Sequence, residues 1–263
     1  MDVMRARDAS ALLVGHWRAG TVLDALPDPL RPATRAEGYA IQAQLEVLSA
    51  EPLRGWKIAA TSAAGQAHIG VDGPLAGRLL AEMVHPDGAT LPFGANRMRV
   101  AEAEFAFRMG RDLPPRAAPY AVEEVLDAVA ALHSAIEVPD SRFTDFATAG
   151  AAQLIADNAC AHLLVLGPEA PTIWRGMDLA AHVVTGRVCG RLEREGRGAN
   201  VLGDPRIALA WLANEVSRHG VTLAAGQVVT TGTCLVPLEV AAGDEVSADY
   251  GVLGRVGLRF SAA

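Results

Sequence analysis

The chain has 263 residues, of which 51% are hydrophobic, and a formal net charge of −7. This length allows one large domain, or one domain with a small partner, and the hydrophobic content argues against disorder. The acidic balance leaves no basic footprint, so we expect neither nucleic acid nor an anionic membrane as partner, and small molecules instead.

The sequence also carries signals about its compartment. No stretch approaches the roughly 20 apolar residues of a membrane span, and the first residues lack the apolar core of a signal peptide. The cysteines at positions 160, 189 and 234 fit neither a disulfide framework nor a zinc motif. We therefore expect a cytoplasmic protein.

The first 70 residues are expected to form a small region of helices and a strand. Apolar residues at helical spacing predict a short helix over residues 9–18. Thr34 and Glu37 have the spacing of a capping box and predict a second helix, which carries Ile41, Leu45 and Leu48 and ends at Glu51-Pro52. A mixed run over residues 53–62 predicts a strand that leaves Lys57 near its end, beside a polar turn.

Lys57 is the only lysine among the 23 lysines and arginines of the chain. Two explanations are open. A compositional bias towards arginine could have spared one lysine by chance. Alternatively, this position needs a compact ammonium with an adjustable pKa, which a guanidinium cannot supply.

An acidic strand is predicted between residues 97 and 107. In a strand, Glu102 and Glu104 share one face, and the neighbours on both faces are mostly apolar. Such a strand is usually buried on both sides, where bare carboxylates are costly. Either one glutamate stays protonated or a cation lies between them, and Glu137 would complete an all-oxygen site for Mg²⁺ or Mn²⁺.

Apolar spacing predicts a helix between the two acidic segments, over Val122, Val125, Val129 and Leu132. Such a helix would return the chain to the same site. Further on, residues 153–161 are expected to be helical, and the local pattern favours Asp157 as part of a helix-terminal cap.

The C-terminal third is expected to be rich in strands around one helix. Strands are predicted between residues 172 and 191 and a charged surface turn over residues 191–200. Asp204 is expected to cap a helix that has Pro205 at its first position. Strands in a curled sheet or barrel are then expected at 227–230, 234–240, 245–250 and 252–260.

Several common chemistries have no motif in this sequence. GxGxxG, GxxxxGK[ST], GxSxG and HExxH are all missing, which argues against common nucleotide, serine-hydrolase and zinc-peptidase sites. The seven histidines form no ligand pair at helical spacing. His68 and His85 flank the loops near Lys57 and could titrate usefully.

Motifs of another kind are present, among them Gly55-Trp56-Lys57-Ile58, Glu102-Ala103-Glu104 and Asp157-Asn158. In these motifs the chain resembles the fumarylacetoacetate hydrolase superfamily. Within it, the resemblance is to the 2-keto-4-pentenoate hydratase branch, which also holds 4-oxalocrotonate decarboxylases. Five motifs in order, over nearly the whole chain, carry it. They are Gly55-Trp56-Lys57-Ile58 with Thr61-Ser62, Gln66 and Ile69-Gly70-Val71-Asp72; Glu102-Ala103-Glu104; Glu137 with Asp140-Ser141-Arg142; Asp157-Asn158; and the C-terminal glycines 226, 232, 243 and 254.

The resemblance implies an α+β fold: a mixed β-sandwich or barrel-like catalytic domain over residues 71–263, preceded by a small helical or α/β region over residues 1–70. It implies that Mg²⁺ or Mn²⁺ is bound and that the protein is a homo-oligomer. Lys57 would be the catalytic cation. The implied metal ligands are Glu102, Glu104 and Glu137, and the implied substrate-binding residues are Thr61, Ser62, Gln66, Asp157 and Thr233.

The implied reaction is divalent-metal-dependent addition of water to a 2-hydroxy-2,4-dienoate, giving a 4-hydroxy-2-oxo acid in aromatic catabolism. Decarboxylation of a 2-oxo diacid and C–C hydrolysis of an acylpyruvate remain alternatives, and hydrolysis would need His68 or His85 as a base. An oligomer that only binds a 2-oxo acid is the alternative that is not an enzyme. Leu75 stands where many hydratases carry an acidic residue, which removes one possible partner of Lys57.

Overall fold

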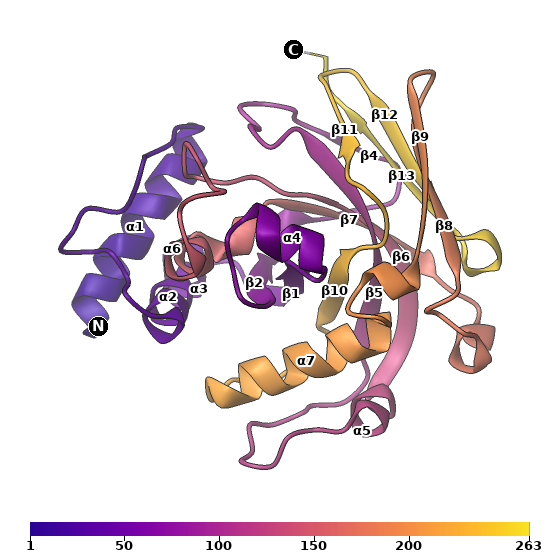
Figure 1. Ribbon diagram of the computed structural model, residues 1–263, viewed down its shortest axis with the longest axis horizontal. Coiled ribbons are helices and arrows are strands. Elements are labelled where there is room, and N and C mark those ends of the chain that lie inside the picture. Colours follow the sequence, from indigo (N-terminus) through magenta and orange to yellow (C-terminus); the bar gives the residue numbers. More distant parts are fainter. Residues whose placement is uncertain (263) are drawn as a thin grey trace.

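The computed structural model describes residues 1–262, which form two β-sheets with helices packed around them (Figure 1). The larger sheet has eight strands, in the order β2-β1-β10-β5-β6-β7-β3, with β11 paired to β5. Its strands are β1 (Leu53–Ala59), β2 (Leu75–Leu80), β3 (Val84–Pro86), β5 (Val100–Met109), β6 (Val129–Val138), β7 (Leu163–Glu169), β10 (Val228–Thr233) and β11 (Leu238–Glu239).

The smaller sheet has five strands and shares the main core with the larger one. Tyr250 joins the two sheets, because its ring packs edge-to-face on Phe105 of β5 at 5.3 Å between centroids and its hydroxyl donates to the Glu104 carbonyl at 2.7 Å. The expected mixed fold with curled sheets is confirmed. The strands of the smaller sheet, in spatial order, are β4 (Ala89–Leu91), β13 (Arg255–Phe260), β12 (Glu245–Asp249), β8 (Val183–Val188) and β9 (Leu192–Arg197).

Helices α1 (Val3–Ala19), α2 (Arg35–Gln42), α3 (Leu45–Ser49) and α6 (Ala151–Ala156) gather on one side of the larger sheet (Figure 1). A second hydrophobic core holds several of them together through residues such as Leu13, Ile41 and Ala156. The predicted first helix is longer than expected, because Asp2 caps it by accepting from the Arg5 amide. Thr34 caps α2 as predicted, but α2 ends at Gln42, and Leu45 and Leu48 lie in the separate short helix α3.

The expected boundary after residue 70 stays a prediction. Strand β1 precedes that point in the sequence, yet it pairs with β2 on one side and β10 on the other. The N-terminal segment thus supplies an inner strand of the larger sheet, and with it Lys57.

The remaining helices lie between strands. They are α4 (Ala63–His68), α5 (Val122–Leu126) and α7 (Pro205–Arg218), with 3₁₀ turns η1 (Ala81–Met83), η2 (Asn158–Cys160), η3 (Thr172–Gly176), η4 (Gly198–Asn200) and η5 (Gly251–Leu253). As predicted, Asp204 caps α7 and Pro205 occupies its first position. None of the helices within residues 1–262 is long and apolar enough to cross a membrane.

Other predicted elements are also wrong. The helix expected to run through Leu132 ends at Leu126, and Val129 already begins strand β6. Because β6 is buried on both faces, its apolar residues also fit helical spacing, and the pattern could not separate the two. The charged segment expected as a turn contains strand β9, whose residues alternate between half-buried and exposed.

Candidate active site

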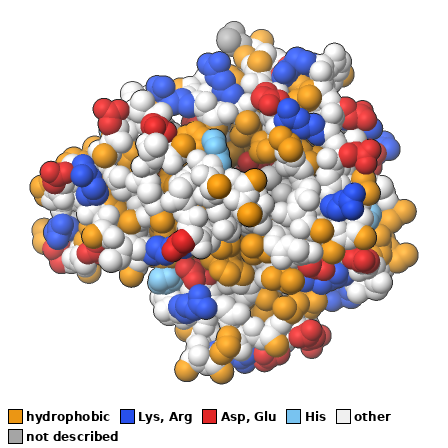
Figure 2. All heavy atoms as spheres, in the orientation of Figure 1, with side chains coloured by type: hydrophobic (Ala, Val, Ile, Leu, Met, Phe, Trp, Pro, Cys, Tyr) orange, Lys and Arg blue, Asp and Glu red, His pale blue; other side chains and the backbone are white. Residues whose placement is uncertain are grey.

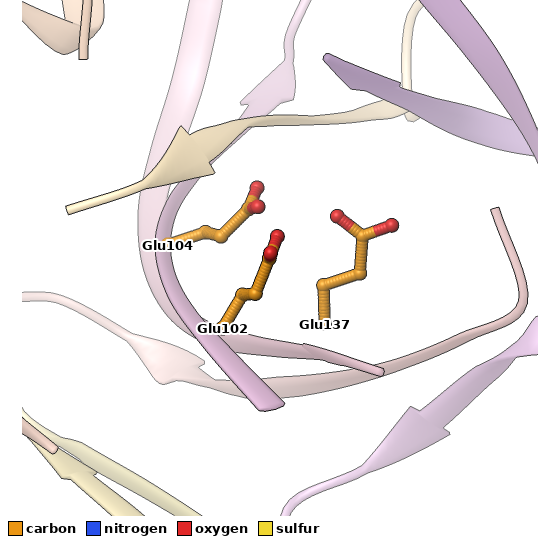
Figure 3. Close-up of side chains that lie close together, drawn as sticks. All are labelled: Glu102, Glu104 and Glu137. Carbon is orange, nitrogen blue, oxygen red and sulfur yellow. The ribbon is translucent and has the colours of Figure 1, made fainter. Parts of the chain in front are cut away.

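Three glutamates converge where strands β5 and β6 run side by side. These strands pair antiparallel with Glu102 opposite Glu137, and Glu104 follows two residues later on the same face. Figure 3 shows the three side chains pointing toward one another. One carboxylate oxygen from each lies within 4.8 Å of the others. The predicted carboxylate cluster is therefore formed by the fold.

The three carboxylates lie together in a place where water cannot solvate them well. Glu104 and Glu137 are fully buried. Burial and the neighbouring charge of Glu137 raise the pKa of Glu102 to about 7, although Lys57 opposes the shift. Burial and the other two glutamates raise the pKa of Glu104 well above its usual value. Such repulsion is relieved when a cation lies between the groups.

Unpartnered oxygens make the cluster a fitting cation site. Neither carboxylate oxygen of Glu137 accepts a hydrogen bond, and Oε1 of Glu104 accepts none. The other oxygen of Glu104 accepts from the Gly232 amide at 2.8 Å, which fixes the direction of that side chain. A set of carboxylate oxygens with free lone pairs suits a hard divalent cation such as Mg²⁺. The residues present thus fit a divalent metal ion.

Lys57 lies beside this cluster and is 3% exposed. Its Nζ is 2.9 Å from Oε1 of Glu137 and donates a hydrogen bond to the Ala159 carbonyl at 3.1 Å. The contact with Glu137 is an ion pair that does not have the geometry of a hydrogen bond. Burial by itself lowers the pKa of Lys57, but the three glutamates outweigh it and raise that pKa above its ordinary value. The contact with the Glu137 carboxylate thus favours the ammonium form of Lys57.

The Ala159 carbonyl reaches Lys57 because the backbone there is left-handed. Asn158, Ala159 and Cys160 have φ values of 56°, 50° and 60°, which non-glycine residues adopt at a cost in energy. The Asn158 side chain holds this turn on β2 by donating to the Arg78 carbonyl at 2.8 Å and accepting from the Arg78 amide at 2.6 Å. A strained turn held in this way is typical of a functional site.

Two glycines allow this close packing. A Cβ on Gly77 would lie 2.4 Å from the Asn158 carbonyl oxygen and 3.0 Å from Cδ of Lys57. Gly232 has φ of 96°, and a Cβ there would lie 2.0 Å from Oγ1 of Thr61. Neither position has room for a side chain without a shift of its surroundings.

A cavity of about 870 Å³ opens beside Lys57 and Glu102. Figure 2 shows a hollow near the middle of this face, with hydrophobic side chains around it and a histidine at its edge. Three of the predicted substrate-binding residues line the cavity, namely Thr61, Ser62 and Thr233. The hydroxyls of Thr61 and Ser62 can donate to an acid at the polar end of the cavity. The Thr233 hydroxyl already donates to the Leu235 carbonyl at 2.8 Å, which leaves its oxygen as an acceptor.

Gln66, a predicted substrate-binding residue, is not among the residues that line the cavity. Its amide donates to the Ala60 carbonyl at 3.1 Å and so supports the backbone of the cavity wall. The two histidines considered as bases differ in position. His68 lines the cavity from α4, whereas His85 lies on β3 and does not.

Asp157 is buried but also lies away from the cavity lining. Its carboxylate accepts from Oγ of Ser141 at 2.7 Å and from the Arg142 amide at 3.0 Å, and it pairs with the Arg142 guanidinium. Its side chain makes no cap hydrogen bond to the short helix η2 that follows. This carboxylate anchors the left-handed turn that carries Ala159.

Several residues contribute to the site through their backbone, so their residue type does not reveal the contribution. The Gly232 amide orients Glu104, and the Ala159 carbonyl accepts from Lys57. Neither contact depends on the side chain of the residue that makes it, so the sequence does not indicate it. Gly77 lies in strand β2, and nothing in the sequence indicates how closely Lys57 packs on it.

Leu75, which replaces a common acidic residue, is fully buried in the main core. It pairs with Ala59 across β1 and β2. The carboxylate partner of Lys57 in this chain is Glu137.

The comparisons with known proteins agree with this geometry. The family model described as fumarylacetoacetate (FAA) hydrolase C-terminal matches residues 78–260. A 2-keto-4-pentenoate hydratase of Burkholderia vietnamiensis strain G4 is 35% identical over 260 residues, covering 98% of this chain and 95% of that protein. The 2-keto-4-pentenoate hydratase 1 of Dechloromonas aromatica is 33% identical, covering 99% of this chain and 98% of that protein.

A solved structure is similar over the whole chain as well. It is the 4-oxalocrotonate decarboxylase of Pseudomonas putida G7, complexed with magnesium and adipate. It superposes with a TM-score of 0.89 at 25% identity, covering 99% of this chain and 98% of that one.

Proposed function

The chain belongs to the fumarylacetoacetate hydrolase family, and from this premise we propose that it is a hydro-lyase. It adds water to a 2-hydroxy-2,4-dienoate and yields a 4-hydroxy-2-oxo acid in the catabolism of aromatic compounds. The observation that carries the proposal is the convergence of Glu102, Glu104 and Glu137 beside a buried Lys57 at the wall of a large cavity. The hydratase names of relatives at 33–35% identity support the choice of reaction.

We assign the metal to the three glutamates and take it to be Mg²⁺ or Mn²⁺. The similar decarboxylase structure contains magnesium, which supports the choice of a hard divalent ion. When bound, this ion supplies Lewis acidity toward the carboxylate and the 2-oxygen of the substrate.

The net chemistry is a tautomerisation followed by addition of water. The enol hydroxyl of the substrate loses its proton while C5 gains one, which gives a conjugated enone. The hydroxyl group of water then adds at C4, and C3 gains a proton. Every proton removed from the enol or from water is thus returned to carbon or to solvent.

In this reaction the ammonium of Lys57 stabilises negative charge on the substrate oxygens and holds a proton near them. Its contact with the Glu137 carboxylate at 2.9 Å favours the charged form, so charge stabilisation is its first role. Thr61, Ser62 and Thr233 lie at the cavity wall, where they orient the acid. Gln66 and Asp157 act indirectly, by supporting the backbone of the wall and of the Ala159 turn.

Decarboxylation of a 2-oxo diacid is the second candidate. It is favoured by the TM-score of 0.89 to the 4-oxalocrotonate decarboxylase, but the identity to that protein is only 25%. C–C hydrolysis of an acylpyruvate ranks lower, because of the two candidate bases only His68 lines the cavity. A protein that only binds a 2-oxo acid would have no need to bury Lys57 against Glu137.

Product analysis distinguishes these reactions. The purified protein with Mg²⁺ is incubated separately with 2-hydroxypenta-2,4-dienoate, 4-oxalocrotonate and an acylpyruvate. The loss of ultraviolet absorbance by each substrate is monitored, and the products are then identified by mass spectrometry. Hydration gives a product heavier than the dienoate by one water. Loss of carbon dioxide from oxalocrotonate with an untouched dienoate would show decarboxylation instead.

We also propose that the protein is a cytoplasmic homo-oligomer, as the family resemblance implies. Light scattering at micromolar concentration should give a particle larger than the 27.5 kDa chain. A particle of the size of one chain would contradict this.

A further inference from the structure

The part of the cavity beyond Lys57 and Glu102 has a chemistry that selects the tail of the substrate. We infer that this protein takes 2-oxo acids and their dienols with an apolar tail and a single carboxylate, and that it discriminates against diacids. The inference rests on the proposed function for the position of the first carboxylate, which lies at the polar end of the cavity.

A second carboxylate would find no dedicated counter-charge in the cavity. Within residues 1–262, the basic side chains that line it are Lys57 and His68. Lys57 is already paired with Glu137 at the metal end. His68 is exposed on α4, with its ring against Phe146 at 5.9 Å between centroids, so solvent screens its interactions. Arginine, which usually holds a substrate carboxylate by two hydrogen bonds, does not line this cavity.

The walls of the cavity are apolar instead. Leucine, isoleucine, methionine, valine and phenylalanine side chains come together there from the β10–β11 loop, the segment before β5, the loops after α4 and β6, and the segment between η4 and α7. The residues that form this apolar wall are Ile69, Met98, Phe146, Leu202, Leu235 and Val236. Each methylene buried on such a wall is expected to improve binding by about fourfold. A carboxylate placed against the wall gains no polar contact that offsets the water it loses.

The cavity is large enough to hold a substrate with a long apolar tail. A volume of about 870 Å³ lies in the upper part of the range of about 300–1,000 Å³ that is typical of sites for drug-sized ligands. A five-carbon acid would leave much of this space to water. A chain of several further carbons, or a ring, would fill it.

The direct test is calorimetric binding to the Mg²⁺-loaded protein of two saturated 2-oxo acids of equal length, 2-oxoheptanoate and 2-oxoheptanedioate. Neither contains the double bonds that hydration needs. We expect the monoacid to bind at least about 30-fold more tightly. Equal affinities, a preference for the diacid, or no binding of either would overturn the inference.

A positive charge placed in the wall should weaken the preference for the monoacid. Val236 is 66% exposed, so Val236→Arg should fold, and it is expected to reduce the preference for the monoacid at least tenfold. The matched control is Val252→Arg, since Val252 is 65% exposed and does not line the cavity, and it should leave the preference unchanged. An unchanged preference in Val236→Arg would overturn the placement of the tail.

Turnover separates this inference from the proposed function. If the monoacid preference appears and 2-hydroxyhepta-2,4-dienoate is hydrated faster than its 1,7-dioate, both stand. If the binding preference appears but no dienoate is hydrated, the inference stands and the hydro-lyase proposal is wrong. If both dienoates are hydrated at equal kcat/KM, the proposed function stands and the inference is wrong.

Discussion

Glu102 and Glu137 lie directly opposite each other in the antiparallel pairing of β5 and β6, so that two acids occupy a position where sheets normally place an attractive pair. Like charges opposite each other destabilise a sheet. Glu104, on the same face, adds a third carboxylate to this cluster. The fold therefore bears a repulsion that a bound divalent ion would remove, and this relationship leads to the first two predictions.

Replacing Glu104 by Gln should have opposite effects with and without metal. One repelling charge is lost, so the metal-free variant should melt a few degrees above the parent, whereas Mg²⁺ affinity should fall by more than tenfold because one ligand is gone. Calorimetry with Mg²⁺ and thermal unfolding with and without a chelator test both effects. Glu193→Gln, at an exposed glutamate, is the control. An unchanged affinity in Glu104→Gln would mean that the metal site is misassigned.

The pH dependence of stability should also change sign with metal. The pKa of Glu102 is about 7 in the fold against 4.5 ordinarily, so between these values the folded chain holds a proton that the unfolded chain has released. Without metal, this group therefore contributes stability that is lost as pH rises from about 4.5 to about 7. Mg²⁺ binds the ionised form, so its affinity should rise over the same range.

The measurement is Tm against pH for the chelated parent and for chelated Glu102→Gln, which lacks this titration. The Tm of the variant minus the Tm of the parent should increase as pH rises from about 4.5 to about 7. A difference that is constant over this window would contradict the raised pKa. The Mg²⁺ affinity of the parent should also be higher at pH 8 than at pH 6.

Gly77→Ala should disturb the site without touching a polar group. Its Cβ would meet the Asn158 carbonyl oxygen at 2.4 Å and Cδ of Lys57 at 3.0 Å, so the left-handed turn and the lysine cannot both keep their places. We expect a loss of stability of about 1–3 kcal/mol and a fall in turnover. Gly15→Ala is the matched control: it lies in helix α1 with nothing within 4 Å of its Cβ, and it should be stabilised by up to about 1 kcal/mol. Urea unfolding measures both, and equal behaviour of the two variants would contradict the close packing.

Lys57→Arg should fold, bind Mg²⁺ and lose about 10²–10⁴-fold in kcat/KM. Lys57 is 3% exposed and packs on Gly77, so the wider, forked guanidinium does not fit where the ammonium lies. The competing explanation, that compositional bias left one lysine by chance, predicts a silent substitution. Lys57→Ala provides the comparison, since it should lose turnover to a similar extent. A kcat/KM of Lys57→Arg within a few fold of the parent value would contradict a catalytic role for Lys57.

The acidic cluster was predictable from the sequence because strand alternation is a local rule. It placed Glu102 and Glu104 on one face, and their apolar neighbours indicated burial. The pairing with Glu137 depended on β6, however, and the beginning of β6 was mistaken for a helix. A segment buried on both faces has no periodicity that separates the two structures.

What the sequence could not supply is mostly backbone geometry. The left-handed run from Asn158 to Cys160 occupies a segment that was expected to be helical. Asp157 looked like a cap, but its partner, Arg142, is set by tertiary packing. Likewise, the pKa of Lys57 depends on the distances from its ammonium to three carboxylates, which no local sequence pattern specifies. Burial alone would lower this pKa, but the three carboxylates raise it.

The central claim is that water is added to a dienoate by this chain through a metal at Glu102, Glu104 and Glu137. The most direct measurement is the rate of loss of 2-hydroxypenta-2,4-dienoate by chelator-treated protein as free Mg²⁺ is added back. Turnover should be absent at the start and should rise to saturation with Mg²⁺, giving a product heavier by one water. Full turnover by the chelated protein, or none at saturating Mg²⁺, would contradict the account.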